Sequence, residues 1–378
     1  MFRPPPDHGA ARRVAIAIVG AGVAGCATAL ALQMAGLEGV VVLDRGAEQA
    51  FRIGESIPAF ALGLLKRLGA YERTAALRPL ESSGSTSLWG KDEPGYNDAM
   101  FDPDGAGWHL DRAAFDAALR DEVRARGIPV LPAGRLKDIR RSHAGGFRLA
   151  FEAGQTIETA LLVDASGVGA AALRRLRIAR NPVDELMVRY VVLALEPAAV
   201  TAARTVLEAV SYGWWYATRI PGDRMVAMLA TDRDVLADTG LSLRTAASLR
   251  RAFEATRLVG PAIAAARPTG IVSVGGASAP SAILSGVAGP DWIAVGDAAW
   301  SCDPLTAQGI TKALMDGLAA GAAIAGRQRG DAGAFPAYQA EAFARFTANL
   351  RLRAALYTAE TRWSDKPFWR ARRLPGAL

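Results

Sequence analysis

Three glycines at fixed spacing, Gly20, Gly22 and Gly25, lie between an apolar run and a helical pattern. In this spacing the first glycine allows a tight turn, the second lets the backbone approach a pyrophosphate, and the third lets the helix pack closely on the strand. The helix starts near Val23 and Ala24, whose backbone N–H groups would face the phosphates. We therefore expect these five residues to bind a dinucleotide.

Acidic residues end three of the predicted strands, where ligands collect in open parallel sheets. The first, Asp44, follows the glycine loop by about 20 residues and is placed to accept hydrogen bonds from an adenosine ribose, with Arg45 beside it. The two later turns combine aspartate with glycine and carry Asp164, Gly167, Gly296 and Asp297. All three are predicted to contact the same nucleotide.

The two later turns resemble the second and third fingerprints of flavoproteins of the two-dinucleotide-binding class, which implies FAD as the nucleotide. By this resemblance Asp297 holds the ribityl chain. The segment that follows supplies a turn at Pro304 and then Gln308, Gly309 and Ile310 at the start of an alanine-rich helix. The N–H groups of that helix can converge on the edge of the flavin that becomes negative on reduction.

Residues 54–58 read Gly-Glu-Ser-Ile-Pro. They are similar to the Gly-Glu-(Ser/Ala)-Thr-x-Pro stretch of the flavin-dependent tryptophan halogenase superfamily. Segments 303–309 and 110–116 resemble further motifs of that superfamily. The resemblance implies that Glu55 and Ser56 lie against FAD.

Halogenases of this superfamily carry a lysine on the substrate side of the flavin, about 25 residues after the Gly-Glu-Ser stretch. Here residues 67–90 contain no lysine, and Ser82 or Ser83 stands near the expected position. The halogenase Trp-x-Trp-x-Ile-Pro signature is also broken, because residues 216–221 read Tyr-Ala-Thr-Arg-Ile-Pro. Both departures disfavour halogenation.

Aromatic residues at Trp214, Trp215 and Tyr216 resemble a segment of halogenase-like monooxygenases, including those that hydroxylate a protein tryptophan during quinone-cofactor maturation. On a strand Trp214 and Tyr216 share one face, so both are candidate catalytic residues, although packing explains at least two of the three. His109 is a candidate proton shuttle or a packing histidine. By the resemblance Arg112 contacts the FAD phosphate or ribityl region; the alternative is a solvated arginine at a helix start.

The elements that must position these residues predict an α/β fold. An FAD-binding Rossmann-like domain of the two-dinucleotide-binding, hydroxylase type is interleaved with a mostly antiparallel substrate sheet and followed by C-terminal helices. Strands are expected at 14–19, 39–43, 156–165 and 292–296, and a three-stretch meander at 189–196, 206–219 and 225–231. Helices are expected at 24–35, from 308 to about 325, and from about 334. The domain boundaries are 1–13 for a disordered leader, 14–80, 101–170 and 285–333 for the FAD domain, 81–100 and 171–284 for the substrate sheet, and 334–378 for the C-terminal helices.

The composition argues against a membrane-spanning, disulfide-rich, metal-binding or nucleic-acid-binding protein. The 378 residues are 51% hydrophobic but contain no apolar stretch of the roughly 18 residues that a membrane span needs. With three histidines, and with Cys26 and Cys302 as the two cysteines, neither a metal cluster nor a disulfide framework is expected. The net charge of +7 is dispersed, which argues against nucleic acid as a partner. The expected location is the cytoplasm.

The expected function is therefore that of an FAD-dependent monooxygenase. Reduced flavin and O2 form a C4a-hydroperoxyflavin that hydroxylates an electron-rich ring, an indole or phenol, with a tryptophan side chain of a protein or peptide among the candidate substrates. NAD(P)H that binds transiently or a separate flavin reductase would supply the electrons. Three alternatives stay open: a halogenase of a free or tethered aromatic, a geranylgeranyl-reductase-like alkene reductase, and a non-catalytic flavin-binding scaffold.

Overall fold

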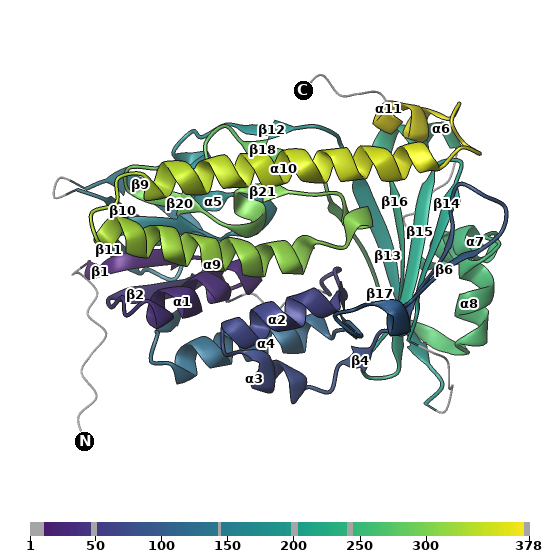
Figure 1. Cartoon of the computed structure of the whole chain (residues 1–378), viewed down its shortest axis with the longest axis horizontal. Helices are drawn as coiled ribbons and strands as arrows, with labels where there is room; N and C mark the ends of the chain where they lie inside the picture. The colour runs from purple at the N-terminus through teal and green to yellow at the C-terminus, as the bar shows by residue number, and fades with distance from the viewer. Residues whose placement is uncertain (1–10, 47–50, 143–144, 198–202, 240–244, 374–378) are drawn as a thin grey trace.

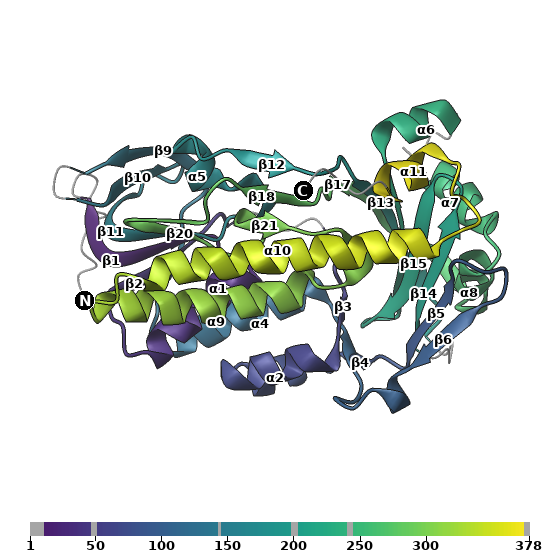
Figure 2. The same ribbon diagram turned by 45° about the horizontal axis from the view of Figure 1, so that its top comes forward.

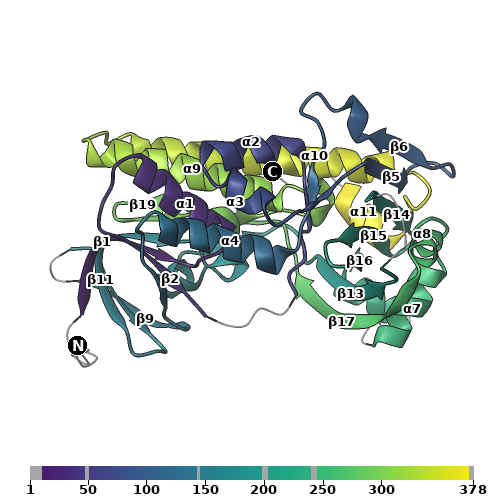
Figure 3. The ribbon, with the colours of Figure 1, turned by 90° about the horizontal axis from the view of Figure 1, so that it is seen from below.

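The structure is a computed structural model that describes residues 11–46, 51–142, 145–197, 203–239 and 245–373. Two β-sheets stand at opposite ends of an elongated molecule, and long helices run between them (Figures 1 and 3). Within the described residues, no helix is both long and apolar enough to cross a membrane.

The first sheet is built on parallel strands in the order β20-β11-β1-β2-β8. Its central strands are continuous apolar runs, as expected for strands buried on both faces by crossover helices. Antiparallel strands extend the sheet at β11 and β20. The strands are β1 (Arg12–Val19), β2 (Val40–Asp44), β8 (Val130–Pro132), β9 (Leu136–Arg141), β10 (Phe147–Phe151), β11 (Thr156–Asp164), β19 (Ala288–Gly289) and β20 (Trp292–Ala294).

The predicted leader, residues 1–13, overlaps the first strand. Its first ten residues lie outside the described part of the chain. Arg12 and Arg13 instead open β1, because they pair in register with Ile157 and Glu158 of β11 and Arg13 forms a 3.1 Å ion pair with Glu158. Two residues assigned to the leader therefore belong to the sheet.

Helix α1 (Val23–Met34) packs on helix α9 (Gly309–Gln328) at close range. A Cβ added at Gly317 or Gly321 of α9 would lie 2.5 Å from the Cβ of Ala27 or Ala31 of α1. The small residues therefore let the two helices approach, and this contact holds the N-terminal glycine loop beside the C-terminal part of the chain. The neighbouring helices are α2 (Ala59–Arg67), α3 (Tyr71–Ala75), α4 (Arg112–Ala125) and α5 (Ala171–Arg175).

The second sheet has seven strands in the order β17-β13-β16-β15-β14-β5-β6. All neighbours are antiparallel except β14 and β5, which confirms the predicted mostly antiparallel sheet. The strands are β5 (Gly84–Leu88), β6 (Gly95–Asp98), β13 (Met187–Leu195), β14 (Thr205–Val210), β15 (Gly213–Ile220), β16 (Arg224–Thr231) and β17 (Pro268–Ser278). Helices α7 (Ala246–Glu254) and α8 (Val259–Ala265) cover its outer face, around Trp215 (Figure 1).

The predicted meander differs from the observed one. Residues 206–219 were expected to form one stretch, but they form two strands, β14 and β15, joined at a tight turn where Gly213 has a φ of 153°. The meander is therefore β14-β15-β16, and β13 lies between β16 and β17. Sequence periodicity identifies strands but carries no information on which non-consecutive strands pair.

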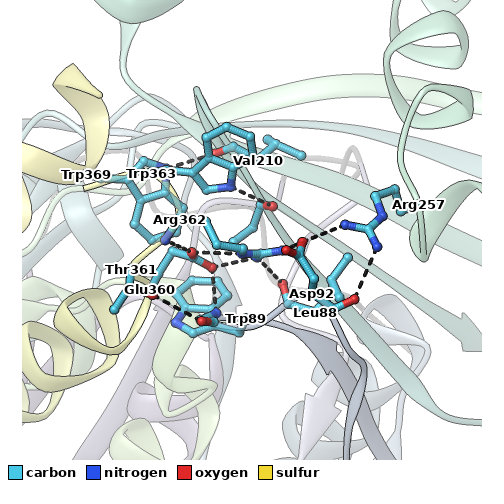
Figure 4. A network of polar contacts seen from close by, with 12 residues as sticks. Leu88, Trp89, Asp92, Val210, Arg257, Glu360, Thr361, Arg362, Trp363 and Trp369 are labelled. Atoms are coloured by element: carbon cyan, nitrogen blue, oxygen red, sulfur yellow. Dashed lines mark hydrogen bonds and ion pairs between the residues drawn. The ribbon is translucent and has the colours of Figure 1, made fainter. Parts of the chain in front are cut away.

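Helix α10 (Ala334–Ala359) runs beside α9 and connects the two ends of the molecule (Figures 1 and 2). Residues 360–373, which we call the C-terminal clasp, fix its far end to the second sheet (Figure 4). The buried carboxylate of Glu360 accepts from Gly90 N at 2.7 Å and from Arg362 at 2.6 Å. Arg362 also donates to the oxygen of Leu88, and Trp369 to the last residue of β14. Helix α11 (Pro367–Arg373) ends this clasp.

Candidate active site

The glycine loop between β1 and α1 leaves room for a ligand at one position. Gly20 has a φ of 114°, and a Cβ there would lie 2.4 Å from the oxygen of Ala165. A Cβ on Gly25 would lie 1.9 Å from the oxygen of Gly20. At Gly22 the nearest atom to such a Cβ is Nη1 of Arg52 at 3.8 Å, and no side chain caps α1. The first turn of α1, which begins at Val23 and Ala24, thus presents free N–H groups beside a guanidinium.

Asp44 ends β2 next to this loop. Its Oδ1 accepts from the N–H of Gly46 at 3.3 Å, and its Oδ2 lies 3.9 Å from Nε of Arg120. The side chain remains partly exposed and Arg45 is exposed. The carboxylate therefore keeps acceptor capacity for a hydroxyl pair.

Asp164 has a different environment. It is fully buried, and its two oxygens accept from Ser166 N and Oγ at 3.0 and 2.6 Å and from the N–H groups of Ala172 and Leu173 at 3.0 and 2.9 Å. The carboxylate shapes the turn and caps α5, and its protein donors leave little acceptor capacity for a ligand. Gly167, with a φ of 78°, has open space around it.

The third fingerprint packs directly on the first. A Cβ at Gly296 would lie 2.6 Å from the Cβ of Ala24. Asp297 beside it is 45% exposed and lies 3.2 Å from the buried Nζ of Lys312, which is also 3.6 Å from Asp316. Burial alone would lower the pKa of Lys312, but the charges of Asp297 and Asp316 outweigh it and raise that pKa. Lys312 was not among the predicted site residues.

The flavin loop, residues 303–310, presents an uncapped helix start. Pro304–Thr306 forms a 3-10 turn, and Ala307 adopts the left-handed conformation with a φ of 49°. Gln308 stands at the N-cap of α9 without a side-chain cap, Gly309 has open space around it, and Ile310 is buried. The first N–H groups of a 20-residue helix are therefore available to an anion.

Arg112 is not a solvated helix-start arginine. It opens α4 and donates to the carbonyl oxygens of Ile53 and Gly54 at 2.9 and 3.2 Å. It also pairs with the buried carboxylate of Asp116 at 3.2 Å, which Arg52 contacts at 3.1 Å. Arg112 thus ties the Gly-Glu-Ser segment to α4 and adds a second positive charge near the glycine loop.

Glu55 is an isolated buried carboxyl in that segment. Its side chain is 2% exposed, and its Oε1 has no hydrogen-bond partner among the described residues. Burial raises its pKa to about 7, although backbone N–H groups and Arg112 oppose the rise. Glu55 therefore changes charge near neutral pH, which suits a residue that accepts or releases a proton.

Ser56, His109 and Tyr216 form a hydrogen-bonded chain. The pairing of β3 (Ser56–Ile57) with β7 (Trp108–His109) sets Ser56 opposite His109, and Ser56 Oγ lies 2.7 Å from Nδ1 and 2.8 Å from the Tyr216 hydroxyl. Nε2 of His109 lies 3.0 Å from the oxygen of Ala203, so Nε2 carries the proton and Nδ1 accepts from Ser56. Burial lowers the pKa of His109 to about 4, so the ring is neutral at pH 7.

The two tryptophans of β15 are packing residues. Trp215 contacts Phe253 on the outer face of the sheet, opposite to Trp214. Trp214 is 1% exposed and donates from Nε1 to the hydroxyl of Tyr357 at 2.9 Å, which donates to Asp303 of the flavin loop at 2.8 Å. Trp214 therefore contacts the flavin loop indirectly, through Tyr357, and does not line the cavity described next.

A cavity of about 740 Å³ opens beside the flavin loop. Its walls are the Gly-Glu-Ser segment with α2, the β5–β6 hairpin with β14, the flavin loop with α9, and one face of α10. Ser56 and Ser82 line it, and so does Lys312, whose Nζ donates to the oxygen of Trp300 at 2.8 Å. Nε1 of Trp300 and Oγ1 of Thr311, both buried in lining residues, have no hydrogen-bond partner among the described residues.

A family model for tryptophan halogenases matches residues 90–377. The chain belongs to the tryptophan halogenase family. Over 369 residues it is 27% identical to LodB of Marinomonas mediterranea, named provisionally as an FAD-dependent oxidoreductase, and the match covers 96% of this chain and 97% of LodB. The superfamily inferred from the Gly-Glu-Ser segment is therefore confirmed.

Two solved structures of this family's fold are 25% identical to the chain. CmlS, a flavin-dependent halogenase, has a TM-score of 0.81 over 96% of this chain and 68% of its own. QhpG, a peptidyl tryptophan dihydroxylase essential for tryptophylquinone cofactor biogenesis, has a TM-score of 0.72 over 97% and 80%. The predicted fold class is confirmed, and the protein is an FAD-dependent oxidoreductase that uses O2 and a supply of reduced flavin.

The residues present fit FAD. Open backbone at Gly22 with Arg52 beside it suits the pyrophosphate, and the exposed oxygen of Asp297 suits a ribityl hydroxyl. The uncapped start of α9 at Gly309 offers N–H donors to the flavin edge. Residues from both halves of the chain thus lie close enough together to bind one FAD molecule.

Proposed function

We propose that this enzyme hydroxylates an electron-rich aromatic ring, and that the ring is a tryptophan side chain in a protein or peptide. When bound, reduced FAD supplies the oxygen atom from O2. The fold shared with a peptidyl tryptophan dihydroxylase supports this reaction, while the halogenase CmlS, with the same sequence identity and a higher TM-score, makes halogenation the alternative to test.

The observation that carries the proposal is the hydrogen bonding of Ser56. A serine hydroxyl has one donor and two acceptor positions. In Ser56 the donor is directed to Nδ1 of His109, and one acceptor position receives the hydroxyl of Tyr216. The remaining acceptor position can receive the N–H of an indole in the cavity that Ser56 lines. Neutral His109 keeps the chain in this orientation, because an imidazolium could not accept from Ser56.

Glu55 is the proposed final acceptor of the ring proton, which reaches it through an intervening group because Ser56 lines the cavity and Glu55 does not. Aromatic hydroxylation releases a proton from the ring carbon, and a group with a pKa near the working pH is best suited to receive it. Glu55 precedes Ser56 in the same segment, and its pKa of about 7 leaves a large carboxylate fraction at neutral pH. Its Oε1, without a partner among the described residues, is free to take a proton.

The charges around the cavity argue against halogenation. The halogenase lysine is expected near Ser82 or Ser83; Ser82 lines the cavity, and a serine hydroxyl cannot carry a halogen oxidant as a lysine amine does. Lys312 also lines it, but its Nζ is committed to Trp300, Asp297 and Asp316. A protonated amine held in this way is not a free nucleophile.

Mass spectrometry of a tryptophan-containing peptide tests the reaction. The holoenzyme is given NADH, a flavin reductase, O2 and the peptide, with and without bromide. Each hydroxylation adds about 16 Da, as expected for one oxygen transferred by flavin chemistry. A brominated product would establish the halogenase instead, and turnover of an alkene without O2 would establish a reductase.

A peptide with 1-methyltryptophan tests the role of Ser56. It lacks the indole N–H, so it should be oxidised about tenfold more slowly than the tryptophan peptide, the value of a lost hydrogen bond of about 1.4 kcal/mol. In Ser56→Ala the two peptides should react at the same rate. The control, Ser87→Ala on β5, should keep the difference, since Ser87 does not line the cavity. Equal rates in the wild-type enzyme would refute the role of Ser56.

A further inference from the structure

Exposed apolar side chains gather around the mouth of the cavity. Phe60 on α2 and Leu352 on α10 both line it, and they are 51% and 42% exposed. Met100 and Phe101, in the 3-10 turn η1 (Ala99–Phe101), are 81% and 78% exposed. Their neighbours on either side, Ala99 and Asp102, line the cavity. We call Phe60, Met100, Phe101 and Leu352 the apolar rim.

The apolar rim has no role in the core. None of its four residues belongs to a hydrophobic core cluster or packs against one in the part of the chain that the structure describes. They come from three separate elements, α2, η1 and α10, each of which contributes residues to the lining of the cavity. Grouped apolar exposure of this kind is typical of a surface that binds a partner.

The segment that carries the exposed turn is acidic. Residues 98–104 contain Asp98, Asp102 and Asp104 and no basic residue, in a chain with a net charge of +7. Asp98 is paired with Arg204, but Asp102 and Asp104 form no ion pair with any described residue. The side of the mouth formed by residues 98–104 is therefore apolar and locally negative, which complements a basic and apolar partner and disfavours an anionic lipid surface there.

We propose that the apolar rim docks a polypeptide segment that flanks the target aromatic residue and carries apolar and basic side chains. This inference rests on the proposed function and specifies its substrate. The cavity takes the target ring and its neighbours, since about 740 Å³ is within the range that holds a ligand much larger than one side chain. Met100 and Phe101, outside the cavity, contact residues farther along the segment, and Asp102 and Asp104 attract their Lys or Arg neighbours.

Binding of labelled peptides tests the docking surface in the holoenzyme. The probes are short peptides with a central tryptophan flanked by leucine and either lysine or glutamate. Fluorescence anisotropy should show that the lysine peptide binds better, and that the double variant Met100→Ser, Phe101→Ser binds it about tenfold or more weakly. The controls, Val272→Ser on β17 and Met34→Ser on α1, remove other exposed apolar side chains, which are 55% and 53% exposed and lie elsewhere, and should bind normally.

A charge variant separates the two parts of the proposal. Asp102→Asn with Asp104→Asn should abolish the preference for lysine over glutamate and leave the leucine contribution in place. Normal lysine-peptide binding by the Met100→Ser, Phe101→Ser protein would overturn the docking surface. The docking surface would also be overturned if the wild-type chain forms a dimer and the Met100→Ser, Phe101→Ser variant does not. The rim would then be an interface between two copies of the chain.

The outcomes also separate this inference from the proposed function. Rim-dependent binding of peptides that are never oxidised would retain the docking surface and reject tryptophan hydroxylation. If the rim variant oxidises the peptides as fast as the wild type does, tryptophan hydroxylation would be retained and the docking surface rejected. For free N-acetyltryptophanamide, which is too short to reach Met100 and Phe101, the rim variant should leave kcat/KM unchanged.

Discussion

The buried carboxyl of Glu55 should make the stability of this protein depend on pH. Its pKa rises from 4.5 to about 7 on folding, and at about 1.4 kcal/mol per pKa unit this corresponds to about 3 kcal/mol. Because the folded pKa is the higher one, the stability contributed by the protonated form is complete below about pH 4.5 and is lost as pH rises through about 7. Glu55→Gln keeps a neutral side chain at every pH and should remove this loss.

Chemical denaturation of the flavin-free protein from about pH 5 to about pH 8 measures the effect. The wild type should lose about 2.5 kcal/mol more than Glu55→Gln over this range, with most of the difference arising between about pH 5 and pH 7. The control is Glu208→Gln: Glu208 is also buried, but its carboxylate accepts from three backbone N–H groups at 2.6 to 3.0 Å. That control should be destabilised by about 1–3 kcal/mol throughout. Parallel pH curves for Glu55→Gln and the wild type would refute the burial argument.

Two further substitutions test the contacts of α10 with the flavin loop and the packing of the glycine loop. Tyr357→Phe removes the hydroxyl that both accepts and donates a buried hydrogen bond, and should cost about 2–4 kcal/mol in denaturant, against about 1 kcal/mol for Tyr338→Phe, which loses one bond; equal losses would contradict the network. Gly25→Ala places a Cβ 1.9 Å from a backbone oxygen and should abolish the flavin absorbance of the purified protein. Gly63→Ala, where the added Cβ meets open space, should retain it.

The sequence was most informative where backbone geometry restricts residue type. Gly20 and Gly25 have no room for a side chain, so the glycine pattern reported the β1–α1 turn directly. The Gly-Glu-Ser segment likewise indicated the superfamily through residues close in sequence. The alternation along β15 also put Trp214 and Trp215 on opposite faces, as expected for a strand.

Contacts between segments far apart in the chain could not be predicted from the sequence. The role of Lys312 depends on contacts with Asp297, Asp316 and Trp300. Of these, only the contact with Asp316 could be expected from the sequence, because the two residues are four apart on one helix. The free acceptor position of Ser56 depends on Tyr216, 160 residues away. Pairing of β13 with β16 was likewise a matter of tertiary packing.

The C-terminal clasp has a consequence for the order in which this enzyme becomes functional during synthesis. One wall of the cavity is α10, and α10 is fixed at its far end by contacts of Glu360, Arg362 and Trp369 with β5, the bend after it and β14, all of which are made much earlier. A ribosome-bound chain that lacks these residues has a complete glycine loop but an unfinished reaction chamber. Such a chain lacks the contacts that fix one wall of the cavity, so the cavity is complete only once the C-terminal clasp has packed on the second sheet.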